Sequence, residues 1–238
     1  MTNNILSASS LCVSFGSQDV LHDVNFTLSS NEVCGIIGPN GAGKTTLLKS
    51  LYGLVRPASG SIRFENHELS GGGVGDRIAR QIAYVPQEQS VFPNLTVEEN
   101  LDLAVTSLPP SRQARRDQQK SVVFDLFPRL RERRRQFAGT MSGGEQRMVA
   151  VGVGLMMQPR VLLLDEPTTG LAPLVVHNLM DVVHQLNRDH GIATVIVEQN
   201  ILSMAKIASR IYLIKEGRGS SFDGDPQGLT KKQIMECL

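Results

Sequence analysis

The chain has 238 residues, which is long enough for one large domain, or a domain with a built-in subdomain, around a sizeable core. Its composition, 41% hydrophobic and 20% charged, excludes a disordered, collagenous or coiled-coil chain. A formal net charge of +1 gives no argument for nucleic-acid binding through bulk charge. Three widely separated cysteines, Cys12, Cys34 and Cys237, predict a reducing compartment. Without a long apolar stretch or a signal-like N-terminus, we expect a soluble chain that is not exported.

The N-terminal part predicts strands followed by a loop and a helix. Residues 5–28 alternate apolar and polar side chains around turn signals, which indicates short antiparallel strands. The apolar run Val33–Ile37 is typical of a strand that is covered on both faces. It ends at Gly38, and the leucines from Leu47 to Leu54 then recur at helical spacing, so that a helix is expected over 46–54.

The middle of the chain predicts two more strands and then a change of character. Ser61–Glu65 and Gln81–Val85 are expected to form a strand pair. From Thr96 to about Phe137 the pattern is polar and helical, with prolines as breaks. This stretch predicts an inserted helical subdomain, with boundaries at about 88–158.

The C-terminal part predicts an alternation of helices and strands. The expected elements are helix Glu145–Met157, strand Val161–Asp165, helix Leu174–His190, strand Ala193–Val197, helix Ile201–Ser209 and strand Ile211–Lys215. Such alternation predicts an α/β fold with a mostly parallel sheet. We therefore expect one domain over residues 1–238, with an N-terminal antiparallel β-subdomain and the helical insertion.

A phosphate-binding motif stands between the third strand and its helix. The sequence from Gly38 to Thr46 fits G-x-x-x-x-G-K-[ST], in which backbone N–H groups and a helix N-terminus surround an anion. Lys44 is expected to reach the β- and γ-phosphates, and Thr45 to offer a hydroxyl to Mg²⁺. The residues expected to contact the nucleotide are Gly38, Pro39, Asn40, Gly41, Ala42, Gly43, Lys44, Thr45 and Thr46. The motif predicts a phosphate-loop NTPase core that binds a nucleoside triphosphate.

Two acidic residues follow the buried strand Val161–Asp165. Such a strand is how phosphate-loop ATPases present a carboxylate to Mg²⁺, so Asp165 is the expected metal-side acid. Glu166 is the candidate base for the attacking water. Taken alone, an apolar strand before an exposed Asp-Glu turn is common, and the interpretation depends on the phosphate loop upstream.

The segment Ser142-Gly143-Gly144-Glu145 has two interpretations. Ser-x-x-Glu is a capping box at a helix start. Two glycines are not needed for a cap, but they expose backbone amides to which a phosphate could bind. With the phosphate loop and the Asp-Glu strand, this segment resembles the signature loop of ATP-binding cassette (ABC) ATPases, and the resemblance covers nearly the whole chain.

The resemblance implies roles for further residues. Gln87 matches the family's glutamine loop, which contacts Mg²⁺ and the attacking water. Phe15 occupies the position of the aromatic residue that stacks on adenine, although a lone phenylalanine in a strand can equally be core. Residues 168–173 lie where the family has its cross-subunit loop. Gln199 stands where the family usually has a histidine, and it is either a γ-phosphate sensor or the start of a surface turn.

Short strings within the chain narrow the resemblance. Residues 96–101, 126–130, 170–173 and 198–200 together look like the ATP-binding subunits of branched-chain amino acid importers, the LivF type. That resemblance implies ATP and Mg²⁺ as cofactors and a second, non-identical ATPase subunit bound head to tail. It also implies two transmembrane permease subunits and, indirectly, an external solute-binding protein. The expected location is peripheral, on the cytoplasmic face of the inner membrane, with no nucleic-acid partner.

Other functions remain open from the sequence. Lipopolysaccharide-export ATPases are the nearest rival, and urea or short-amide import is another. A soluble ABC ATPase acting on DNA or ribosomes usually has coiled-coil insertions or two cassettes, and neither occurs here. A scaffold that does not hydrolyse ATP is suggested by Gln199 and opposed by the intact Lys44, Asp165 and Glu166.

A basic segment lies inside the expected helical subdomain. Residues 111–135 contain nine Lys or Arg and only three acidic residues. Three interpretations stay open: a solvated helix face, contact with anionic lipid, and contact with nucleic acid. The absence of aromatic residues within 129–135 weakens the last.

Overall fold

The computed structural model describes residues 4–88, 91–222 and 224–228. An antiparallel sheet contains β1 (Asn4–Phe15), β2 (Gln18–Ser29), β4 (Ser59–Phe64) and β5 (His67–Glu68), in the order β2-β1-β4-β5. The expected antiparallel strands are confirmed, but β1 and β2 are 12 residues each and therefore not short. Cys237 lies outside the described residues.

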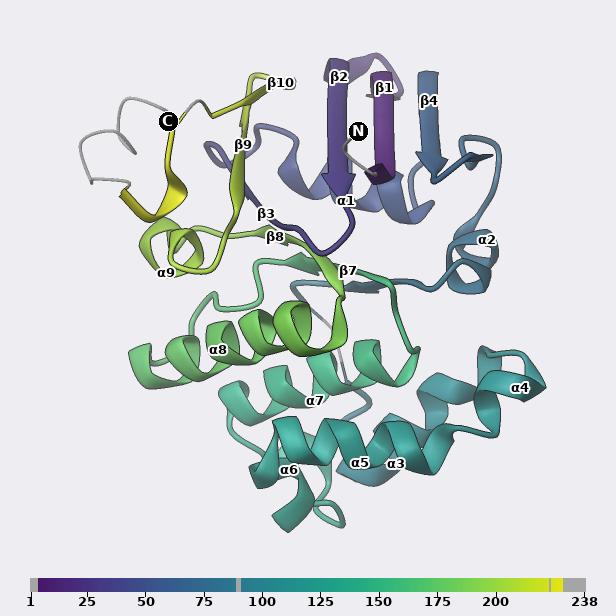
Figure 1. Cartoon of the computed structure of the whole chain (residues 1–238), viewed down its shortest axis with the longest axis vertical. Coiled ribbons are helices and arrows are strands. Elements are labelled where there is room, and N and C mark those ends of the chain that lie inside the picture. The colour runs from purple at the N-terminus through teal and green to yellow at the C-terminus, as the bar shows by residue number, and fades with distance from the viewer. Residues whose placement is uncertain (1–3, 89–90, 223, 229–238) are drawn as a thin grey trace.

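A second sheet of six strands forms the centre of the molecule (Figure 1). Its order is β10-β9-β3-β8-β7-β6, and every neighbouring pair is parallel except β9 with β10. The strands are β3 (Val33–Ile37), β6 (Ile82–Val85), β7 (Val161–Asp165), β8 (Ala193–Val197), β9 (Arg210–Lys215) and β10 (Arg218–Ser221). The expected mostly parallel sheet is confirmed.

The helices lie between and beside these strands. They are α1 (Lys44–Tyr52), α2 (Val74–Ala79), α3 (Val97–Ala104), α4 (Pro110–Gln113), α5 (Arg116–Leu126), α6 (Pro128–Glu132), α7 (Gly143–Met156), α8 (Pro173–His190) and α9 (Ile201–Ala205). Short 3-10 turns occupy Val105–Ser107, Ala138–Thr140 and Pro226–Gly228. No helix within the described part of the chain has both the length and the apolar character to cross a bilayer.

Two expectations about the elements were wrong. The strands β4 and β6 do not pair: β4 pairs with β1 in the antiparallel sheet and β6 with β7 in the central sheet. The helix α2 carries the chain from one sheet to the other, and an alternating pattern identifies a strand without identifying its partner. The helix α9 ends at Ala205 instead of Ser209, and β10 was missed because Arg218–Ser221 is polar.

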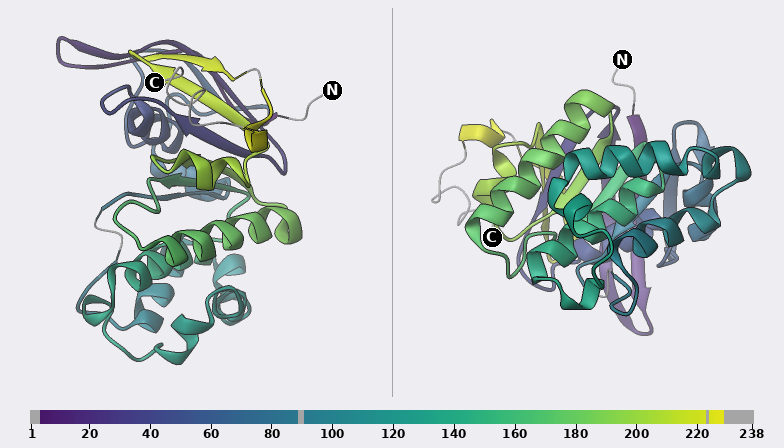
Figure 2. Two further views of the ribbon diagram at one scale, coloured as in Figure 1. Left: turned by 90° about the vertical axis from the view of Figure 1, so that its left-hand side faces the viewer. Right: turned by 90° about the horizontal axis from the view of Figure 1, so that it is seen from below.

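The central sheet is buried on both faces, and successive side chains along each strand enter different clusters. Leu163 of β7 packs in the cluster that contains the α1 leucines and the antiparallel sheet. Leu162 and Leu164 pack in the cluster of α7, α8 and α9. This follows from the two-residue period of a strand. The molecule is therefore layered, with the antiparallel sheet and α1 on one side of the central sheet and the helical part on the other (Figures 1 and 2).

We expect Leu163→Ala to lower the free energy of unfolding by about 2–5 kcal/mol, because the shorter side chain leaves a cavity in a fully buried cluster. Leu54, which is 53% exposed just beyond α1, provides the control, and Leu54→Ala should cost about 0.5 kcal/mol or less. Urea unfolding followed by circular dichroism measures both. Equal midpoints for the two variants would contradict this packing.

Candidate functional site

Four loops meet at one edge of the central sheet. The parallel strands β3, β8, β7 and β6 are neighbours in that order, so the segments that follow their carboxyl ends lie side by side. These segments begin at Gly38 after β3, Glu198 after β8, Glu166 after β7 and Pro86 after β6. The sequence separates them by as much as 160 residues, and the fold brings the predicted site residues of all four together.

The loop after β3 has the geometry of an anion site. Gly41 and Gly43 have φ angles of 78° and 106°, a region that favours glycine. Gly43 is the N-cap of α1 and makes no side-chain hydrogen bond to the helix, and no acidic residue lies in the first turn. The backbone N–H groups at this helix start are thus left for a ligand. Pro39, Asn40 and Ala42 lie in the loop, and Thr45 and Thr46 in the first turn of α1.

Lys44 lies within this loop and is only 5% exposed. Its ammonium donates to the carbonyl oxygens of Gly38 and Pro39, each at 2.8 Å. Burial lowers the pKa of Lys44, and the charges of Glu166 and Asp165 oppose that shift. The ammonium therefore stands among carbonyl dipoles and near two carboxylates, a position that is suited to a polyanionic ligand.

Thr45 and Asp165 are in direct contact. The Thr45 hydroxyl donates to Asp165 Oδ1 at 2.9 Å, and the Tyr84 hydroxyl donates to Asp165 Oδ2 at 2.9 Å. Burial raises the pKa of Asp165, while these two hydrogen bonds lower it. A cavity of about 290 Å³ opens beside the group, lined by Thr45, Lys49, Tyr84, Pro86, Gln87, Glu88 and Asp165.

Glu166 is the point at which the other loops meet. Its Oε2 accepts from Gln199 Nε2 at 2.8 Å, from Gln87 Nε2 at 2.9 Å and from the Thr169 hydroxyl at 3.0 Å. Glu166 also has a φ angle of 45°, which is uncommon for a residue with a side chain and turns the chain sharply after β7. The structure thus brings the side chains of Gln87, Glu166 and Gln199 together.

Glu198 is a buried carboxylate beside this group. It accepts hydrogen bonds from the N–H of Thr168 at 2.8 Å and from the N–H groups of Gln199 and Asn200 at 3.2 and 3.4 Å. These bonds join the loop after β7 to the loop after β8. Burial raises the pKa of Glu198, although the hydrogen bonds favour its charged form.

The segment Ser142–Glu145 lies elsewhere. It begins α7, which packs in the cluster on the face of the central sheet opposite α1 (Figure 1). Ser142 and Glu145 form a complete capping box, so the local interpretation of this motif is correct. Burial alone would raise the pKa of Glu145, but hydrogen bonds from Ser142 and the nearby Arg133 and Arg129 hold it below its usual range.

Phe15 is 52% exposed at the end of β1. The hairpin to which it belongs approaches the phosphate loop, because a side-chain carbon on Gly43 would come within 2.6 Å of Leu21 and 3.2 Å of the Val20 carbonyl oxygen. An exposed aromatic ring leaves its face open to a flat ligand.

The sequence profile of the ABC transporter family matches residues 21–169. The chain is 41% identical over 234 residues to the high-affinity branched-chain amino acid transport ATP-binding protein BraG of Pseudomonas aeruginosa, covering 98% of both chains. It is 35% identical to the lipopolysaccharide export system ATP-binding protein LptB of Haemophilus influenzae, covering 97% of this chain and 95% of that protein. The chain belongs to the ABC transporter family. The ABC cassette MJ1267 in its ADP conformation has the same fold, with a TM-score of 0.85, 23% identity and 98% of each chain covered.

Some residues of this ABC site were not assigned from the sequence. Tyr84 donates a hydrogen bond to Asp165, and Thr169 donates one to Glu166. Glu198 accepts one from the backbone of Thr168, in the loop after β7. Only Glu198 left a signal that could have been used, a charged residue directly after the buried strand Ala193–Val197. Tyr84 and Thr169 act through single hydroxyl groups, which periodicity does not distinguish from packing residues.

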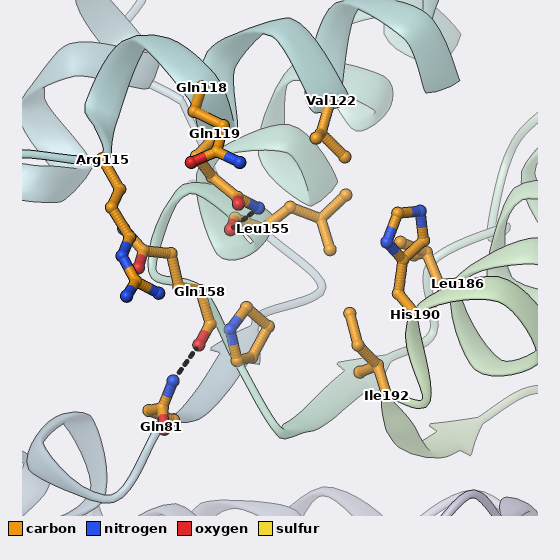
Figure 3. A pocket seen from close by; sticks show the side chains of 11 residues that line it. Gln81, Arg115, Gln118, Gln119, Val122, Leu155, Gln158, Leu186, His190 and Ile192 are labelled. Atoms are coloured by element: carbon orange, nitrogen blue, oxygen red, sulfur yellow. Dashed lines mark hydrogen bonds between the residues drawn. The ribbon is translucent and has the colours of Figure 1, made fainter. Parts of the chain in front are cut away.

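A second pocket lies at the opposite edge of the central sheet (Figure 3). It has a volume of about 320 Å³ and is lined by Gln81, Arg115, Gln118, Gln119, Val122, Leu155, Gln158, Pro159, Leu186, His190 and Ile192. Gln81, Pro159 and Ile192 lie just before the strands β6, β7 and β8. Gln81 and Gln119 already donate to the carbonyl oxygens of Gln158 and Leu155. This pocket is therefore remote from the four loops.

Most basic side chains of the segment 111–135 form ion pairs with carboxylates of the same chain. Lys120 contacts Glu98 and Asp102, Arg131 contacts Asp125, and Arg129 and Arg133 both approach Glu145. These pairs favour the interpretation of the segment as a solvated helix face whose charges are balanced by neighbouring carboxylates.

We expect Glu198→Gln to remove a pH dependence of stability. The folded protein holds the Glu198 proton more tightly than the unfolded chain does, so this carboxylate's contribution to stability falls as the pH rises above the ordinary glutamate value of about 4.5. Glutamine keeps an acceptor oxygen but does not titrate. The free energy of unfolding of the wild type minus that of Glu198→Gln should therefore decrease as the pH is raised above about 4.5.

A difference between wild type and Glu198→Gln that does not vary with pH would contradict the raised pKa.

Proposed function

We propose that this chain is the ATP-hydrolysing subunit of an ABC importer, and that the imported solute is a branched-chain amino acid. One observation carries the ATPase proposal: Lys44, Thr45, Asp165 and Glu166 come together at the edge where four parallel strands end. The similarity to BraG supports the solute, since it exceeds the similarity to LptB. Lipopolysaccharide export and urea or short-amide import are the alternatives that the test below must separate.

In this proposal the phosphates of ATP bind to the loop after β3. The backbone N–H groups of Gly41 and of residues 43–46, at the N-terminus of α1, would surround the phosphate oxygens. Lys44 would exchange its two carbonyl acceptors for the β- and γ-phosphates, a change from neutral to charged acceptors that strengthens its hydrogen bonds. Phe15 would stack on the adenine, for which its exposed ring is available.

The residues beside the phosphate loop fit Mg²⁺. Hard cations prefer oxygen ligands, and Thr45 and Asp165 present a hydroxyl and a carboxylate in contact, with Gln87 lining the same cavity. These three residues would hold the ion, which would neutralise phosphate charge when bound.

Glu166 is the proposed general base. Its Oε2 accepts from Gln87, Thr169 and Gln199, and no donor among the described residues bonds to its Oε1. The three donors therefore fix the carboxylate while one oxygen remains available to accept a proton from water. Gln199 is proposed to orient Glu166 and to donate to the γ-phosphate during turnover.

The signature segment 142–145 is proposed to act on the ATP of a second ABC subunit, bound head to tail. Its location on the helix α7, across the central sheet from α1, supports action in trans. Two transmembrane permease subunits and an external solute-binding protein would complete the importer, with this chain on the cytoplasmic face of the membrane. No nucleic acid is part of the proposal, because most of the basic segment is paired within the chain.

The direct test is transport by the complete assembly. The chain is purified with the membrane subunits that bind it and reconstituted in vesicles with the external binding protein. We expect ATP-dependent uptake of leucine, isoleucine or valine, and we expect Lys44→Ala to abolish both hydrolysis and uptake, because it removes the ammonium that faces the phosphates. Lys206→Ala, at an exposed position after α9, is the control and should transport normally. If hydrolysis is instead coupled to urea uptake or to lipid extraction, the proposal of a branched-chain amino acid as solute is wrong.

Glu166→Gln should still bind Mg·ATP but hydrolyse it roughly 10²–10⁴-fold more slowly, because an amide does not accept the proton of water. Trapped ATP should then hold this chain to its partner ATPase subunit. Size-exclusion chromatography with and without ATP, in the presence of that subunit, measures the association. If the two subunits stay apart with ATP bound, the head-to-tail arrangement is wrong.

A further inference from the structure

Arg147 is a buried cation that connects two parts of the site. It is the fifth residue of α7, two residues beyond the signature segment, and is only 9% exposed. Its Nη1 donates to the carbonyl oxygen of Pro86 at 2.7 Å, and its Nη2 donates to the carbonyl oxygen of Gln87. The guanidinium therefore joins a helix of the signature segment to the loop that follows β6, about 60 residues earlier in the chain.

The side chain of Gln87 continues this connection. Its Nε2 donates to Glu166 Oε2 at 2.9 Å, while its backbone carbonyl accepts from Arg147. Two hydrogen bonds of one residue, Gln87, therefore connect α7 to the carboxylate of Glu166. A shift of α7 moves the backbone of Gln87, and the amide moves with it.

The arginine side chain at this position does more than fill space. The guanidinium is a rigid fork, so it fixes two successive carbonyl groups at once, which a flexible ammonium does not do. Burying a cation is costly, and burial lowers the pKa of Arg147, against the charges of Glu198 and Asp165. An apolar side chain of similar length would fill the space without that cost.

We propose that Arg147 is a positioning residue that makes Gln87, and through it Glu166, follow the movement of α7. When the signature segment at the start of α7 binds the second subunit, the resulting shift of α7 would change the position of Glu166, the base of its own subunit. This inference rests on the proposed ATPase function. Arg147 touches neither nucleotide nor water in this role.

Arg112 offers a matched control. It also donates from a guanidinium to two backbone carbonyls, of Ile78 at 2.8 Å and Met157 at 3.5 Å, and it joins α4 to α2 and to the end of α7. It does so at the opposite edge of the sheet, near the ends of α2 and α7, away from Gln87. Loss of Arg112 removes comparable contacts without touching the connection to Glu166.

The test is a double-mutant cycle on ATP hydrolysis by the assembled transporter. We expect Arg147→Met to lower kcat roughly tenfold or more with KM for ATP within about twofold, and Arg147→Lys to restore part of the loss. Added to Gln87→Ala, Arg147→Met should cause little further loss, because both act on Glu166 through one path. Arg112→Met should leave kcat near the wild-type value. Equal losses from Arg147→Met in the presence and absence of Gln87, or equal effects of the two arginine changes, would overturn the proposal.

A second measurement does not depend on activity. Hydrogen–deuterium exchange of the full chain should be faster over residues 84–88 in Arg147→Met and in Arg147→Gln, but not in Arg112→Met. Unchanged exchange in that segment would overturn the proposal even if the transporter proved to have another solute or no turnover. A wild-type assembly that does not hydrolyse ATP, with faster exchange in Arg147→Met, would refute the proposed function and leave the connection intact.

Discussion

The parallel pairing of four strands is the constraint on which the rest of the site depends. Ile36 of β3 and Asp165 of β7 both pair with Val197 of β8, and Val85 of β6 pairs with Leu164. The carboxyl ends of the four strands are therefore level to within about one residue. Each loop must leave the sheet at the same edge, so the strand pairing brings residues from four distant segments together, and hydrogen bonds between them then fix their positions.

That edge concentrates charge in a place with little water. Lys44, Asp165, Glu166 and Glu198 are all at most 6% exposed. Burial opposes the charged form of each group whose pKa is shifted, and neighbouring groups of opposite charge or hydrogen bonds compensate. The result is a set of charges that are fixed before a ligand arrives, which makes electrostatic stabilisation of a reacting phosphate effective in an ATPase of the proposed kind.

The sequence predicts the elements of this site better than their contacts. Apolar runs and helical spacing identified β3, β7, β8 and α8 nearly to the residue, because these elements are buried on both faces or strongly amphipathic. The pairing of β4 and β6 was predicted wrongly, since strand partners depend on the path of the chain through α2. Gln87, Glu166 and Gln199 were each proposed from a motif, but their meeting at one carboxylate oxygen depends on loop conformations, such as the positive φ of Glu166, that no pattern encodes.

The replacement of the family's usual histidine by Gln199 has a consequence for proton transfer. The donors on Glu166 Oε2 are two amides and one hydroxyl, and none of them titrates near neutral pH. A histidine at position 199 would change charge within the physiological pH range and could take up a proton itself. With glutamine there, the donors orient the carboxylate but do not compete for the proton. If this site hydrolyses ATP, as proposed, the proton of the attacking water must therefore pass to Glu166 or directly to phosphate oxygen, and Gln199 contributes only as a neutral hydrogen-bond donor.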